Sequence, residues 1–173
     1  MAGLTKIRWD PILAQSYTKS FRSECVRALK QIAEPICALY EYPDLILINI
    51  CDFKSNQNII GKDYKYIIGV ALQDESVIYI DKAAVKNREK ATKLIDKYLL
   101  ETVLVHELAH LFIPDNIMHS LTWARSVVHI WDVIHEGMAI SKKDLRALIL
   151  LDLKPNMSKI KYSKMKSELP KRG

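Results

Sequence analysis

Apolar and polar positions recur with two different spacings along this chain and divide it into helices and strands. Between residues 16 and 40 apolar side chains recur every three or four positions, which predicts an amphipathic helix capped by Ser16 or Thr18. Pro35 lies inside this stretch, where it is expected to kink or end the helix. Residues 45–50 form a continuous apolar run, a pattern typical of a strand that is covered on both faces.

Two further strands are expected over residues 66–72 and 76–81. Only three polar residues separate them, and so short a link predicts a hairpin. Residues 54–65 are mostly polar and contain a glycine, so we interpret this segment as a loop.

Helices are expected over most of the second half of the chain. One helical stretch runs from residue 83 to 112 and can break near Asn87. Ser120 and Ser141 can cap two more helices, the last of which ends near Leu153. A helix, three strands and then several helices predict an α+β fold, in which helices pack against one small sheet.

The net charge is concentrated at the C-terminal end. Of the +6 total, all is accounted for by residues 154–173, which contain seven basic residues and one acidic residue. The length of 173 residues suits one domain. We therefore expect one domain over residues 1–153, followed by a basic, flexible tail over residues 154–173.

Membrane and secreted classes are disfavoured by composition. No stretch of 18 uncharged apolar residues is present, and the N-terminus lacks the apolar core of a signal peptide. The three cysteines form no C-x-x-C pair, and their odd number argues against a disulfide framework. These features predict a cytoplasmic protein without a membrane partner.

One motif carries metal chemistry. Residues 106–110 read His-Glu-Leu-Ala-His within the predicted helix. Positions i and i+4 share one helix face, so His106 and His110 can bind the same zinc ion. Glu107 then projects beside the metal without binding it, where it can act as the general base that accepts a proton from zinc-bound water.

A catalytic zinc ion usually has three protein ligands, and two residues are candidates for the third. His119 follows His110 by nine positions and comes just before the capping Ser120, where a short loop can fold back to the metal. Glu136 would lie roughly 24 Å along that next helix, at about 1.5 Å per residue, and would reach the metal only if the helix ended early.

These two histidine elements resemble those of the SprT-like metallopeptidases. His-Glu-Leu-Ala-His at 106–110, eight intervening residues and His-Ser-Leu-Thr-Trp at 119–123 are similar to the small archaeal and phage-type members of that family. The strand before the active-site helix also fits their pattern. The resemblance implies a minimal zincin fold, a zinc ion bound by His106, His110 and His119, and a catalytic Glu107.

The chain departs from the family pattern in two respects. No Gly or Pro follows His119, and no four-cysteine zinc ribbon follows the domain. In addition, the string Glu-Gly-Met-Ala at 136–139 resembles the E-G-x-A element of gluzincin peptidases, which keeps Glu136 as the alternative third ligand.

The function expected from these residues is zinc-dependent hydrolysis of peptide bonds in a protein or peptide substrate. Zincin substrates usually pair with an edge strand, and residues 76–81 are the expected edge. A second interpretation is a nucleic-acid-associated binding module, which would contact phosphates through the basic tail. A third is a zinc-binding scaffold without catalytic activity.

Overall fold

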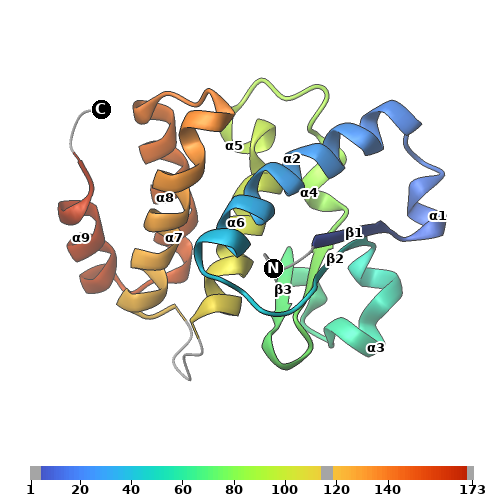
Figure 1. The fold of residues 1–173 in the computed structure, drawn as a ribbon, viewed down its shortest axis with the longest axis horizontal. Coiled ribbons are helices and arrows are strands. Elements are labelled where there is room, and N and C mark those ends of the chain that lie inside the picture. Colours follow the sequence, from blue (N-terminus) through green and yellow to red (C-terminus); the bar gives the residue numbers. More distant parts are fainter. Residues whose placement is uncertain (1–4, 114–118, 171–173) are drawn as a thin grey trace.

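The computed structural model describes residues 5–113 and 119–170, and its strands form a single mixed sheet (Figure 1). The strand order is β1-β2-β4-β3. Strands β1, β2 and β4 run parallel, and β3 is antiparallel to β4. The strand bounds are β1 Thr5–Trp9, β2 Ile46–Cys51, β3 Gly69–Leu72 and β4 Val77–Asp81.

Helices form most of the rest of the described chain, which confirms the predicted α+β class. The bounds of the α-helices are α1 Pro11–Ala14, α2 Lys19–Leu39, α3 Gln57–Ile60, α4 Ala83–Lys86, α5 Leu94–Lys97, α6 Leu99–Phe112, α7 Leu121–Ile134, α8 Lys142–Asn156 and α9 Lys159–Glu168. Four short 3₁₀ turns in the described residues are η1 Phe53–Asn56, η2 Tyr64–Tyr66, η3 Gln73–Glu75 and η4 His135–Met138.

Helix α6 is the central element of the molecule. It contacts α2 and the strands β3 and β4 on one side and α7 and α8 on another (Figure 1). Residues 100–105 are all buried, and the isoleucines of β2 and β4 that belong to the same core are fully buried. A helix enclosed in this way is held rigidly by packing.

The opposite face of the sheet is more open. Lys6 and Arg8 of β1 are exposed there, and Leu47 and Asn49 of β2 are only half-buried. The apolar run at residues 45–50 is therefore a strand, as expected, but it is not fully covered on both faces.

The predicted helix boundaries rest on real caps. The Thr18 side chain accepts a hydrogen bond at the start of α2, Ser120 does so at the start of α7 and Ser141 at the start of α8. Pro35 lies inside α2, which ends only at Leu39. The hairpin of β3 and β4 is also confirmed.

Two local predictions are wrong, and a third is confirmed in part. Residues 54–65 are not simply a loop, because they contain most of η1, all of α3 and most of η2. The helical stretch over residues 83–112 breaks at Asn87, directly after α4, and it is divided further into α5 and α6. Residues 76–81 are not an edge strand, because β4 lies between β2 and β3. The cause is topological: β4 pairs with β2 on one side and with β3 on the other, so β3 is the edge on the hairpin side. The N-terminal strand β1, missed in the sequence, forms the other edge beside β2.

The C-terminal segment is not a flexible tail in its described part. Helix α8 continues past residue 153 to Asn156, and α9 packs against α7 and α8. Met165 and Leu169 are buried in the main core, and Arg125 forms an exposed ion pair with Glu168. Within the described ranges, no helix combines the length and apolar character needed to cross a membrane.

Candidate metal centre

Three histidine side chains converge between α6 and the start of α7. Nε2 of His106 lies 3.2 Å from Nε2 of His110 and 3.1 Å from Nε2 of His119. One ligand atom from each of the three residues lies within 4.8 Å of the other two. This is the arrangement in which three imidazoles can hold one metal ion.

Local backbone structure explains how the histidines meet. His106 and His110 are one turn apart on α6, so their side chains share one face. His119 has a left-handed backbone with φ of 55°, immediately before Ser120 caps α7. A non-glycine residue in that region is uncommon and often marks a functional site.

Side chains from α7 and α8 hold the cluster from behind. Oδ1 of Asp152 lies 2.8 Å from Nδ1 of His106, and this carboxylate is almost fully buried. Asn156 donates a hydrogen bond of 2.7 Å to the backbone carbonyl of Asp152. Trp123 packs its ring against all three imidazoles, with centroid distances from 4.6 to 5.3 Å. Such outer contacts orient ligand rings before any metal binds.

For two of the three histidines, the shift in pKa favours the neutral imidazole. Burial, together with the neighbouring histidines, lowers the pKa of His110 to about 3. Burial also lowers the pKa of His119, with His106 acting in the same direction. For His106 burial opposes protonation, but the hydrogen bond and charge of Asp152 outweigh it and raise the pKa. Neutral imidazole is the form that binds metal.

Glu107 lies next to the cluster and is buried, with 6% of its surface exposed. Its carboxylate packs beneath β3 at Gly69. Burial raises the pKa of Glu107 to about 7, although the charge of His106 and a backbone hydrogen bond from Ala71 act against this shift. A carboxyl group with a pKa in this range can both accept and release a proton near neutral pH.

Glu136 is not brought to this site. It lies in the 3₁₀ turn η4 beyond the end of α7, is exposed, and does not belong to the histidine cluster found among residues 5–113 and 119–170. The geometry of the described residues therefore assembles His106, His110 and His119, and leaves the alternative ligand outside.

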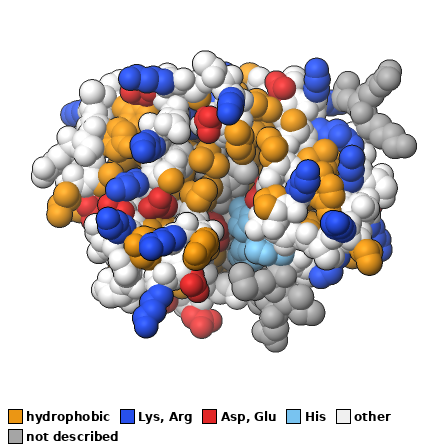
Figure 2. All heavy atoms as spheres, turned by 180° about the vertical axis from the view of Figure 1, so that it is seen from behind, with side chains coloured by type: hydrophobic (Ala, Val, Ile, Leu, Met, Phe, Trp, Pro, Cys, Tyr) orange, Lys and Arg blue, Asp and Glu red, His pale blue; other side chains and the backbone are white. Residues whose placement is uncertain are grey.

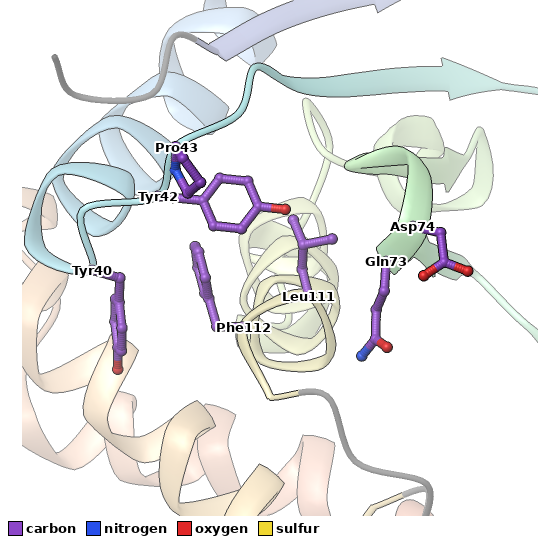
Figure 3. Close-up of a pocket in the computed structure, with 7 residues that line it drawn as sticks. All are labelled: Tyr40, Tyr42, Pro43, Gln73, Asp74, Leu111 and Phe112. Atoms are coloured by element: carbon purple, nitrogen blue, oxygen red, sulfur yellow. The ribbon is translucent and has the colours of Figure 1, made fainter.

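The cluster is accessible from solvent. Figure 2 shows histidine side chains in a hollow on one face of the molecule. A separate cavity of about 440 Å³ opens at the C-terminal end of α6, between aromatic side chains on one side and Gln73 on the other (Figure 3). The Gln73 amide donates hydrogen bonds to the carbonyls of His110 and Ile113, and so links the hairpin turn to the end of α6.

Comparisons with protein-family models, with curated proteins and with solved structures gave no match to this chain. The site therefore has to be interpreted from its own geometry. Sequence reasoning identified the three histidines and Glu107, but it missed Asp152, Trp123 and Gly69. Only Trp123 carried a signal, because it lies in the element that contains His119 and follows the capping Ser120.

Proposed function

We propose that this protein is a zinc-dependent metallopeptidase. One observation carries the proposal: a buried carboxylate, Glu107, lies on the same helix as two of three imidazoles that converge on one point. Three imidazole donors suit zinc among the common biological cations, and Mg²⁺ or Ca²⁺ would favour oxygen ligands. The resemblance of the two histidine elements to those of the SprT-like family supports this proposal.

The proposed reaction divides its tasks among named residues. A bound zinc ion would polarise the substrate carbonyl and acidify a water molecule. Glu107 accepts a proton from the attacking water on its carboxylate and passes it to the leaving amine. Asp152 holds the ring of His106, and Trp123 limits the movement of all three imidazoles.

Strand β3 is the proposed platform for the substrate. It is the edge strand on the hairpin side of the sheet, and it passes directly over Glu107. An extended peptide that paired with its free edge would carry its backbone past the carboxylate. This assignment replaces residues 76–81, which lie inside the sheet.

Metal removal and restoration test the proposal. Purified protein should hydrolyse unfolded protein substrates, lose that activity after chelation and regain it with about one equivalent of zinc. The variant His110→Ala should stay inactive after zinc is added. His129→Ala is the matched control, because this exposed histidine lies outside the cluster and its loss should leave activity unchanged.

Two outcomes would contradict the proposal in different ways. Hydrolysis that survives complete zinc removal would exclude the metal from catalysis. Tight zinc binding without hydrolysis of any protein in a broad panel would instead support the inactive zinc-binding scaffold.

A further inference from the structure

Strand β3 crosses helix α6 at Gly69 with no room for a side chain. A Cβ atom at this position would lie 2.5 Å from Oε1 of Glu107 and 2.8 Å from its Cγ. It would also lie 2.7 Å from Cγ1 of Val103. All three separations are shorter than real Cβ contacts, so a side chain at position 69 requires Glu107 or Val103 to move.

Space, and not backbone conformation, is the reason for glycine at this position. Among the described glycines only Gly61 has a left-handed backbone, with φ of 97°. Gly69 opens strand β3 and pairs with Ile80, in backbone geometry that other residues adopt readily. The missing side chain therefore serves the close approach of the strand to the helix.

The three atoms nearest to a Cβ at position 69 belong to Val103 and Glu107, and none of them belongs to an imidazole. Val103 and Glu107 are one turn apart and form the ridge that β3 crosses. His106, one position before Glu107, instead faces Asp152 of α8 and Trp123 of α7. A change at position 69 should therefore reach the carboxylate and leave the imidazoles in place.

We propose that Gly69 is a positioning residue for Glu107. Its bare backbone forms one wall of the slot that holds the carboxylate beside the histidine cluster, and any larger residue displaces that carboxylate. The consequence for turnover rests on the proposed function, because it requires Glu107 to be the base. The placement of the carboxylate itself does not depend on what the protein hydrolyses.

Thermal unfolding of metal-free protein tests the placement without any activity measurement. Gly69→Ala should lower Tm by roughly 3–10 °C, the scale of an overpacked contact in a domain of this size. In a Glu107→Ala background two of the three crowded atoms are gone and only Cγ1 of Val103 remains, so the same substitution should lower Tm by less than half as much. An equal loss in both backgrounds would overturn the proposal.

Gly137→Ala is the matched control for this cycle. A Cβ atom at Gly137 would meet nothing within 4 Å, so this substitution should behave the same with and without Glu107. Zinc affinity should be unchanged in Gly69→Ala, since the imidazoles keep their places. A loss of zinc affinity of tenfold or more would show that position 69 acts on the metal site instead.

Turnover separates positioning from a purely structural role. In Gly69→Ala we expect kcat to fall by about 10–100-fold with KM nearly constant, because small misplacements of a catalytic group have effects of this size. In a Val103→Ala background the two contacts with Glu107 remain, so Gly69→Ala should still lower kcat there to a similar extent. Recovery of kcat in that double variant would contradict the proposal. If the wild type hydrolyses nothing, the proposed function fails, and the Tm cycle still decides whether Gly69 places the carboxylate.

Discussion

Helix α6 carries two buried carboxylates, one of which is paired with an arginine. Glu101 is 1% exposed and accepts two hydrogen bonds from the Arg88 guanidinium, with N to O distances of 2.6 and 2.9 Å. Glu107 is nearly as buried, but within residues 5–113 and 119–170 it forms no ion pair with Lys or Arg. The first charge is compensated, whereas the second is left with a raised pKa.

This difference separates structural from chemical use of the same side chain. A buried carboxylate paired with Arg is fixed as an anion and serves packing between elements. A buried carboxylate without a cation exchanges its proton near neutral pH, which is what a general base requires. Substituting one carboxylate at a time tests the chemical role of Glu107 and the structural role of Glu101 separately.

The largest effect is expected for Glu107→Gln. The substitution keeps the shape of the side chain and removes the base, so turnover should fall by about 10²–10⁴-fold. Zinc content should stay near that of the wild type, because Glu107 is not among the clustered ligands. Steady-state kinetics on zinc-loaded protein measures the effect, and unchanged turnover would exclude Glu107 as the base.

For Glu101→Gln we expect a loss of stability and little change in turnover. Loss of this partner leaves the buried Arg88 charge with only the exposed carboxylate of Glu24, 3.5 Å away. The free energy of unfolding should therefore fall by about 3 kcal/mol, the lower end of the range for breaking a buried ion pair. Zinc affinity and turnover of the folded protein should change little. Urea denaturation gives the free energy, and Glu168→Gln is the control, because that carboxylate is exposed in its ion pair with Arg125. Equal stability losses in the two variants would remove the distinction between the buried and the exposed pair.

Asp152→Asn should have a smaller effect, confined to the metal. The carboxylate orients His106 through Nδ1, and loss of such an outer partner typically weakens metal binding by about 10–100-fold. Competition with a zinc chelator measures this change. An affinity equal to the wild type would mean that packing by Trp123 alone orients the imidazole.

A further effect concerns pH and the metal-free protein. Burial raises the pKa of Glu107 from 4.5 to about 7, so the folded state holds this proton more tightly than the unfolded state. That contribution to stability is fully present below pH 4.5 and is lost as pH rises through about 7. The stability of Glu107→Gln relative to wild type should therefore rise across this window and then level off, as urea denaturation in the presence of a chelator would record. A constant difference would contradict the raised pKa.

The sequence predicts the parts of the site that depend on local spacing. His106, Glu107 and His110 follow from positions on one helix, and His119 follows from its place before a capping serine. Asp152 lies 46 positions from His106 and meets it only because α8 packs on α6, which no local pattern encodes. Gly69 carries no signal either, since its role depends on how closely β3 crosses α6.

In the fold, too, local patterns are visible in the sequence and long-range contacts are not. Strand β1 did leave a trace, because Ile7 and Trp9 alternate with the exposed Lys6 and Arg8. Its parallel pairing with β2 is a long-range contact, and it changes the order of the sheet. The many lysines of α9 led to the prediction of a solvated tail. Met165 in this helix and Leu169 directly after it are nevertheless buried, because they pack against the core.

The metal-binding role of His119 is the central claim, and zinc stoichiometry tests it most directly. Elemental analysis should find about one zinc per chain in the wild type and in Glu136→Ala, and much less in His119→Ala at the same sub-micromolar free zinc. The alternative ligand is exposed and outside the cluster, so its loss should have no effect. Full zinc occupancy in His119→Ala, or loss of zinc in Glu136→Ala, would contradict the site described by the three histidines.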